Sequence, residues 1–327
     1  GLLWGALLGV SLQYVLNTEV MRYTLAKGES VFLGFRRMSV LITVWYIIST
    51  FIPWSIPGFS SAASELLTHL FPVLPEKLVA IGLLILTGVI LSVGSSLYKT
   101  MERFQKGVIL IGLPLLFGIA IWLARAEHWQ EMIWGMAGHG DGWWLFPSGV
   151  SIASFLGAFA YAGAGGNLNL AQSYYIKEKG FGMGKYAAKV GALFSKESAP
   201  ATIEGTDFAD TKQNWNRWQQ WWRLVSMEHA IVFWTLGLIT IMVMSVLART
   251  TVYGSEVSSG LSFLYGEAEV ISQVMGSTVG MFFLLIASLM LFSTQLGVLE
   301  SSARIISENV LLLGYKKGKK VNMSLGF

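Results

Sequence analysis

The sequence contains no cysteine among its 327 residues. This absence excludes disulfide bonds, thiolate metal sites and cysteine nucleophiles. Charged residues make up only 13% of the chain, about half of what a soluble domain of this length carries. Hydrophobic residues make up 54%, and the mean hydropathy is +0.57. The apolar residues form continuous runs and not the alternating segments of a membrane β-barrel, so the sequence predicts an all-α polytopic membrane protein.

The sequence also lacks the short motifs that mark common catalytic sites. It has no HExxH zinc motif, no GxSxG nucleophile turn, no GxxxxGKS/T phosphate loop and no GxGxxG after a strand. We therefore expect no enzymatic activity and no cofactor, and the chain offers no loop for an ATP-driven pump. The net charge of +4 does not predict nucleic-acid binding, because loop lysines and arginines set the topology of membrane proteins.

Seven apolar segments are long enough to cross a lipid bilayer. In the second of them, Pro53 and Pro57 predict a kink or a break of the helix. The last segment is expected to continue as a helix to Leu313. The predicted spans are Leu2–Met21, Val40–Ala63, Leu78–Leu97, Gly107–Ala124, Ile152–Ile176, Met227–Leu247 and Met275–Val298.

Positive charge predicts the orientation of these spans. All but three of the 23 lysines and arginines fall in the loops after the first, third, fifth and seventh spans. The exceptions are Lys77, Arg125 and Arg249. Because cytoplasmic loops are basic, we expect a cytoplasmic C-terminus and an integral protein of the plasma membrane, in a bacterium the inner membrane. A chain that enters from outside on an apolar span is expected to be a fragment without an earlier helix, so residues 1–327 form one incomplete transmembrane domain.

Two loops carry features of their own. The inner loop 177–226 ends in Trp215, Trp218 and Trp222 at helical spacing, which predicts an amphipathic helix at the membrane interface. The same helix is also a candidate docking surface for a partner protein. In the outer loop, His139 and Asp141 stand in GHGDG and could bind a metal weakly, although a plain solvated loop is the simpler interpretation.

The segment 154–172, SFLGAFAYAGAGGNLNLAQ, lies inside the fifth span. Each glycine costs roughly 1 kcal/mol relative to alanine in a helix interior. Backbone without helical hydrogen bonds survives at membrane depth only where it faces protein or a watery cavity. We therefore predict a broken helix, the device with which secondary transporters build ion sites. Close helix packing through the glycines is the alternative interpretation. The residues of the predicted break are Ala162, Gly163, Ala164, Gly165, Gly166 and Asn167.

Polar side chains elsewhere in the spans are further site candidates, because they are costly in a bilayer. Gln13 and Asn17 lie four residues apart and share one face of the first span. Asn169 follows the glycine-rich break, and Thr294 and Gln295 lie in the last span. We expect Gln295 to contribute to the ion site and the other four to line it.

Charged residues near the span ends have a simpler interpretation. Glu19 lies close to Arg22 and Arg37, so a local ion pair is expected there. Glu300 and Arg304 are four residues apart on one helix face, a spacing typical of an internal salt bridge.

Three segments follow one another in a familiar order: LLWGALLGVSLQYVLNTEVMRYTLAKGESV, GAFAYAGAGGNLNLAQS and FSTQLGVLESSARIISENVLL. They resemble the second, sixth and eighth helices of the Nramp (natural resistance-associated macrophage protein) family of divalent-metal transporters, and in particular its divergent bacterial relatives. The resemblance covers the whole chain as helices two to eight. It implies a LeuT-type inverted-repeat transporter fold, with the family's metal-binding Asp-Pro-Gly-Asn break located before Gly1.

The resemblance also shows departures that bear on the substrate. The family's metal-binding methionine falls at Ala164 and its histidine at Gly166, whereas Asn167 matches the asparagine of the motif. The family's site-lining glutamine falls at Gln295, and the acids of its third helix are missing before Glu65. Losing a thioether removes one source of selectivity for manganese or iron. Asparagine and carbonyl oxygens suit a hydrated hard cation such as magnesium.

These observations lead to one favoured hypothesis and two alternatives. The favoured one is a secondary transporter or symporter that moves a small inorganic ion, a divalent metal cation above all, by alternating access. Ala162 and Gly163 would supply carbonyl oxygens, and Asn167 and Gln295 would supply either side-chain oxygens to the metal or hydrogen bonds to its ligands. The first alternative is an Nramp-related transporter of a small anion such as bicarbonate. The second is a non-transporting membrane sensor, scaffold or intramembrane enzyme. Deletion of 191–210 separates the two classes, because a transporter should largely keep its transport whereas a sensor should lose its signalling.

Overall fold

The computed structural model describes residues 2–92, 97–160, 162–163, 165–187, 203–254 and 260–316. Ala164 of the predicted break lies outside this part. Its regular elements are helices, apart from the antiparallel strand pair β1 (His139–Gly140) and β2 (Trp143–Trp144). The helices of the first half are α1 (Leu3–Lys27), α2 (Val31–Met38), α3 (Val40–Trp54), α4 (Gly58–Leu70), α5 (Glu76–Ser92), α6 (Leu97–Leu123) and α7 (Ala126–Met136).

The second half continues in the same way. Its elements are α8 (Ile152–Ala160), the 3-10 helix η1 (Gly166–Ala171), α9 (Gln172–Lys179), the 3-10 helix η2 (Gly182–Tyr186), α10 (Lys212–His229), the π-helical turn η3 (Ala230–Thr235), α11 (Leu236–Thr251), α12 (Ser262–Met275) and α13 (Ser277–Leu313). The predicted all-α class is confirmed, and so is the continuation of the last helix to Leu313.

Four helical stretches of the described residues are long and apolar enough to cross a membrane: Val40–Leu70, Glu102–Leu123, Lys212–Thr251 and Ser277–Leu313. The chain is therefore a helical membrane protein. Of the remaining predicted spans, Leu2–Met21 corresponds to the 25 residues of α1, and Leu78–Leu97 is described as helix up to Ser92. The span Ile152–Ile176 has a different form, because α8 has only 9 residues, fewer than the roughly 20 that a bilayer core needs. The predicted number of seven spans stays a prediction.

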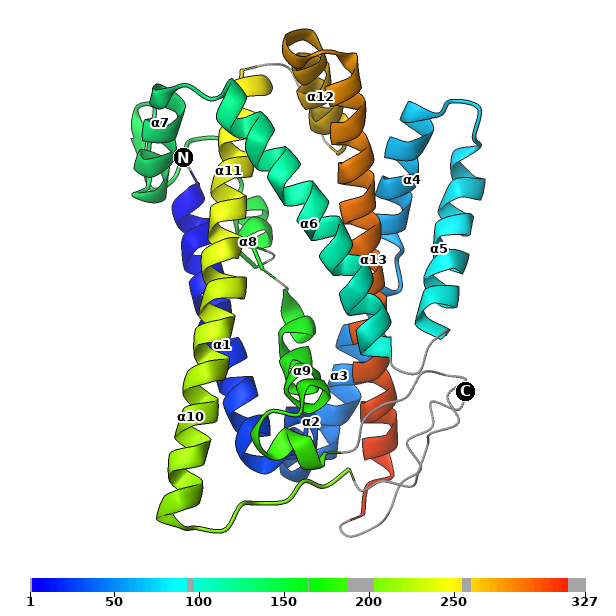
Figure 1. The fold of residues 1–327 in the computed structure, drawn as a ribbon, viewed down its shortest axis with the longest axis vertical. Helices are drawn as coiled ribbons and strands as arrows, with labels where there is room; N and C mark the ends of the chain where they lie inside the picture. The colour runs from blue at the N-terminus through cyan, green and yellow to red at the C-terminus, as the bar shows by residue number, and fades with distance from the viewer. Residues whose placement is uncertain are drawn as a thin grey trace.

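Two helices organise the packing. The long α13 packs against α3, α4, α6 and α12, and α1 packs against α8, α9 and α10 (Figure 1). α11 contacts both groups through α6 and α1. The largest apolar cluster joins α4, α6, α11, α12 and α13 through side chains such as Leu66, Ile119, Leu247, Ile271 and Phe283. We call the two ends of the molecule the α12 end and the α2 end, after the helices that lie there.

α10, η3 and α11 form one continuous helix of 40 residues, about 60 Å long at 1.5 Å per residue. The predicted helix on the membrane surface is therefore the extension of a long helix toward the α2 end (Figure 1). Two of its tryptophans are in contact with other helices. Trp218 and Trp222 pack against Met21, Leu25 and Ile176, because their apolar faces cover α1 and α9.

Glycines let α1 and α8 approach closely. A Cβ atom at Gly5 would lie 2.6 Å from the Phe155 ring, and one at Gly9 would lie 2.5 Å from the carbonyl oxygen of Phe159. These glycines are four residues apart and therefore lie on one face of α1, the arrangement of close helix pairs in membranes. The alternative interpretation of small residues as packing surfaces thus holds for α1, next to the segment predicted to break.

α12 folds back tightly onto the start of α13. The chain reverses at Gly276, whose φ of 98° favours glycine, and a Cβ atom at Gly280 would lie 1.9 Å from Ser272 Oγ. Glu267 of α12 is only 1% exposed, and burial raises its pKa to about 7. One carboxylate oxygen of Glu267, Oε2, has no hydrogen-bond partner within the described part of the chain. The ionised form of this side chain is thus poorly solvated.

We predict that Gly9→Ala destabilises the helix bundle, because the added methyl group would meet backbone and not a flexible side chain. Overpacking of this kind costs about 1–3 kcal/mol. Gly82→Ala in α5 is the matched control, since nothing lies within 4 Å of the added Cβ. The measurement is thermal unfolding in detergent, followed by the loss of the monodisperse peak. A Gly9→Ala protein as stable as Gly82→Ala would contradict the close packing of α1 on α8.

A second prediction concerns Glu267 and pH. Its folded pKa of about 7 lies above the ordinary value of 4.5, so stability is highest below pH 4.5 and falls as pH rises through 7. Glu267→Gln should remove this loss and raise stability at pH 8 by about 1–3 kcal/mol, with little effect at pH 4.5. Melting curves of both proteins at the two pH values test the prediction, with Glu269→Gln on the exposed side of α12 as control.

Candidate functional site

The predicted break is present in the backbone. α8 ends at Ala160, and a 3-10 helix begins at Gly166. Between them, Ala162, Gly163 and Gly165 are not helical. Gly165 has φ of 73° and Gly166 has φ of 53°, conformations that L side chains rarely adopt. Gly165 and Gly166 are therefore required by the backbone, which takes up left-handed φ values where α8 ends.

Gln13 of α1 joins the two ends of this break. Its Nε2 donates to the carbonyl oxygen of Ala160 at 3.0 Å, and its Oε1 accepts from the N–H of Gly165 at 3.4 Å. A helix end leaves such backbone groups without partners inside the helix. Gln13 was predicted to line the site. In the structure it is buried and supports the broken backbone, which is a positioning role.

Gly163 is confined from two sides. A Cβ atom there would lie 2.3 Å from Gln13 Oε1 and 2.9 Å from the ring of Phe233. Phe233 belongs to the π-helical turn η3, and its ring stacks on His229 at 4.7 Å between centroids. The break is therefore wedged between α1 and the long helix that contains η3.

A second interruption separates α3 from α4. α3 ends at Trp54, the residues Ser55–Pro57 are not helical, and α4 begins at Gly58 without a side-chain cap from its own N-cap residue. The break predicted from Pro53 and Pro57 is confirmed. The chain turns at Pro57, whereas Pro53 is accommodated in the last turn of α3.

Gln295 of α13 supports this second break. Its Oε1 accepts from the N–H of Ser60, the third residue of α4, at 3.2 Å. Gln295 is 1% exposed. It was predicted to contribute to the ion site, either as a ligand or through hydrogen bonds to the ligands, and this stays a prediction. In the structure its Oε1 satisfies one of the free N–H groups at the start of α4. Gln13 and Gln295 thus hold one interruption each.

Asn167 connects the two interrupted helices. Its Nδ2 donates to Ser49 Oγ at 2.8 Å and to Thr50 Oγ1 at 2.9 Å, both near the end of α3. The Oδ1 atom accepts no hydrogen bond from the described residues. Of the two residues predicted as metal candidates, Asn167 is the one whose carbonyl oxygen remains available as a ligand.

Two other predicted residues are buried amides with unsatisfied atoms. Asn17 is 0% exposed, and neither of its amide atoms has a partner in the described part of the chain. Asn169 donates to the carbonyl oxygen of Gly166 at 3.4 Å, and its Oδ1 has no partner there. A buried polar group without a partner costs about 1–3 kcal/mol. Such groups are typical of sites that hold water or an ion.

A cavity of about 950 Å³ lies beside both interruptions. Its wall includes Gly163 and Thr294 of the predicted residues, together with Pro53 and Phe59 from the ends of α3 and α4. Thr294 Oγ1 is bonded to the carbonyl oxygen of Met290 in its own helix at 2.9 Å. The structure thus divides the predicted set: Gly163 and Thr294 line the cavity, whereas Gln13 and Gln295 stabilise the helix ends around it.

Charged side chains line the part of the cavity toward the α2 end. The predicted salt bridge between Glu300 and Arg304 is confirmed, and Arg304 also bonds Glu178 at 3.1 Å. Across the cavity, Glu102 accepts from Lys106 at 2.9 Å and from Lys179 at 3.0 Å. Sequence reasoning missed Glu178, because its partner is 126 residues away. Arg304 can neutralise only one of its two carboxylates.

The other predicted charge features are local. Glu19 and Arg22 form an exposed ion pair, as expected. In the strand pair, His139 packs between Trp134 and Trp144, and Asp141 accepts from Tyr253 at 3.3 Å.

The described residues contain no group of three or more His, Cys, Asp or Glu that could hold a metal ion.

No protein-family model matches the chain, and no curated protein matches it. The resemblance to the Nramp family therefore depends on the quoted segments alone.

We predict that Gln295→Glu keeps the cap of α4 at pH 4.5, where a carboxyl group this deeply buried is protonated and neutral and its oxygen can still accept from Ser60 N–H. Gln295→Leu removes the acceptor and leaves a buried N–H without a partner, at a cost of about 1–3 kcal/mol. Thermal unfolding of the two variants measures the difference, with Gln219→Leu on the exposed face of α10 as control. Equal loss of stability in both Gln295 variants would show that the cap contributes nothing.

Proposed function

We propose that this chain belongs to a secondary transporter of a small inorganic ion, with a divalent metal cation as the favoured substrate. The proposal depends on one observation: two interrupted helices, α3–α4 and α8–α9, are tied together by Asn167 beside a cavity of about 950 Å³. Broken helices around a cavity are a feature of secondary transporters, whose ion sites use backbone carbonyls and helix ends.

The chemistry of the break supports a cation. Ala162 and Gly163 are outside regular helix, so their carbonyl oxygens are not committed to a helical ladder. Asn167 Oδ1 adds a side-chain oxygen close to them in the chain. Oxygen ligands without thiolate, thioether or imidazole favour hard ions such as magnesium or manganese over softer transition metals. The volume leaves room for an ion that keeps part of its water shell.

The proposed architecture is an Nramp-like, LeuT-type fold, in which the described helices correspond to helices two to eight. In this assignment α1 is the second helix, α8–η1–α9 is the broken sixth helix and α13 is the eighth. Alternating access then follows from movement of the half-helices about their interruptions. The quoted sequence segments support this correspondence, and the predicted orientation adds a C-terminus on the cytoplasmic side.

The experiment is uptake of Mn²⁺ and Mg²⁺ into liposomes that contain the protein in its full natural length, with and without a pH gradient. Asn167→Ala should lower uptake by about ten- to a hundredfold, the usual cost of losing a group that tunes a metal site. Asn216→Ala on the exposed face of α10 is the matched control and should leave uptake unchanged.

Two results would contradict the proposal. Uptake of neither ion by a folded protein would exclude the divalent-metal assignment and would move the substrate to a small anion such as bicarbonate. Uptake that survives Gly165→Leu together with the loss of both amides, Asn167 and Gln295, would show that the ion passes elsewhere.

A further inference from the structure

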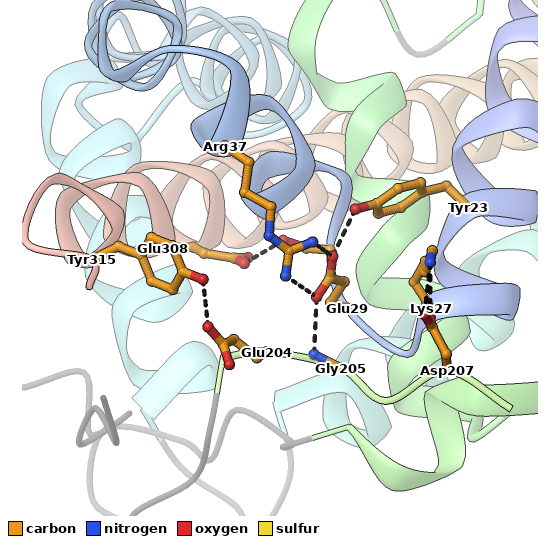
Figure 2. A network of polar contacts seen from close by, with 10 residues as sticks. Tyr23, Lys27, Glu29, Arg37, Glu204, Gly205, Asp207, Glu308 and Tyr315 are labelled. Carbon is orange, nitrogen blue, oxygen red and sulfur yellow. Dashed lines mark hydrogen bonds and ion pairs between the residues drawn. The ribbon is translucent and has the colours of Figure 1, made fainter. Parts of the chain in front are cut away.

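The segment Ile203–Asp207 lies across the α2 end of the bundle, between η2 and α10, and we call it the strap. Its side chains and backbone contact the end of α1, the start of α2 and the end of α13 (Figure 2). The residues are Ile203, Glu204, Gly205, Thr206 and Asp207. In the sequence this segment looks like an ordinary polar part of the inner loop 177–226, and nothing there predicts these contacts.

The strap is fixed by one apolar contact and three polar ones. Ile203 is 4% exposed and belongs to an apolar cluster with Phe32. Glu204 accepts a hydrogen bond from Tyr315, which follows α13. The N–H of Gly205 donates to Glu29 Oε2 at 3.0 Å, and Asp207 pairs with Lys27 at 2.9 Å.

Glu29 is the centre of this network. The side chain is almost fully buried, and its carboxylate accepts from Tyr23 at 2.7 Å and pairs with the Arg37 guanidinium (Figure 2). A buried carboxylate requires hydrogen bonds from its surroundings. The donors come from α1, α2 and the strap, so one carboxylate holds three separate segments together.

Gly205 is required by the close contact. A Cβ atom there would lie 1.9 Å from the carbonyl oxygen of Lys27 and 2.8 Å from the N–H nitrogen of Glu29. Only glycine lets the strap backbone approach near enough to donate to the Glu29 carboxylate. Any larger residue must lift the strap from α1.

The strap is also connected to the candidate site. Leu168 and Tyr174, which line the cavity, belong to the same apolar cluster as Ile203. In the other direction the strap leads into α10, whose continuation η3 places Phe233 against the break at Gly163. Movement of the strap would therefore reach the break both through the cluster and through the long helix.

We infer that the strap is a latch that closes the α2 end of the bundle and must be released when the cavity opens there. This inference rests on the proposed transport function and adds a conformational control to the same site. Release is feasible because, among the described residues of the strap, Ile203 is the buried side chain, whereas the hydrogen bonds of Glu204 and Gly205 are partly buried. The Lys27 and Asp207 side chains are 45% and 68% exposed, so water can replace their ion pair.

The first test uses thiol labelling, because residues 1–327 contain no cysteine. Any cysteine elsewhere in the full-length protein is first replaced by serine. Ile203→Cys places a single thiol under the strap, and Gln219→Cys places one on the exposed face of α10. Maleimide labelling of the full-length protein is measured under native conditions and compared with the rate of global unfolding. A latch opens locally, so Ile203→Cys should react faster than global unfolding allows.

The same measurement is repeated with Gly205→Ala and with Glu29→Gln. Both should raise the labelling rate of Ile203→Cys by about tenfold or more while the protein stays folded and Gln219→Cys is unchanged. Lys27→Gln, which removes only the exposed pair, should have little effect. Labelling that never exceeds the rate of global unfolding, in any of these backgrounds, would overturn the latch and show a fixed part of the fold.

A second test separates the latch from the proposed function. Cysteines at Glu204 and Tyr315 are joined by a reducible bis-methanethiosulfonate crosslinker, and Mn²⁺ and Mg²⁺ uptake is followed before and after reduction. A latch predicts that the crosslink blocks uptake and that reduction restores it. Full uptake with the crosslink in place would overturn it. If neither form takes up an ion while the labelling results hold, the transport proposal is wrong and the local opening stands. The 191–210 deletion cannot serve as a neutral control, since it removes the strap.

Discussion

Backbone groups at an interrupted helix need hydrogen-bond partners that the helix itself no longer supplies, and most of this structure depends on how that need is met. Two glutamines provide the partners. Gln13 spans the gap between Ala160 and Gly165, and Gln295 accepts from the first turn of α4. Each glutamine belongs to one of the two helices around which the others pack, α1 or α13. The helices that hold the bundle together therefore also hold its irregular segments in place.

In the candidate site, the side chains that hold the backbone in place differ from the groups that are available to a ligand. Gln13 and Gln295, whose oxygens accept hydrogen bonds from the backbone, define the geometry, whereas the backbone carbonyls of the break and the side-chain oxygens of Asn17, Asn167 and Asn169 are the groups left for a ligand. The cavity meets charge only toward the α2 end, where Arg304 is shared between Glu178 and Glu300. There the carboxylates of Glu102, Glu178 and Glu300 are matched by Lys106, Lys179 and Arg304, so the charges of these six groups balance.

Sequence reasoning located the interruptions but not the side chains that support them. Glycines at 163, 165 and 166 and prolines at 53 and 57 act locally, so their effect on a helix is visible in the sequence. The partners of Gln13 lie about 150 residues away, and that of Gln295 lies 235 residues away. In the sequence a buried glutamine that caps a helix looks the same as one that binds an ion. Similarly, tryptophans at helical spacing fit a membrane interface and a packed helix face equally well, so the packing of Trp218 and Trp222 on α1 and α9 could not be predicted. Glu29 and the strap were missed because nothing in a short polar loop indicates burial.

The π-helical turn η3 has a mechanical consequence. It lies in the middle of the 40-residue helix from Lys212 to Thr251, where Phe233 touches the break at Gly163. The 18 residues of α10 extend about 27 Å beyond it at 1.5 Å per residue. With the turn as a fulcrum, a tilt of about 10° would carry the far end of that arm through about 5 Å. A small rotation at the break would thus become a large displacement at the far end of α10, large enough to separate the strap from α1.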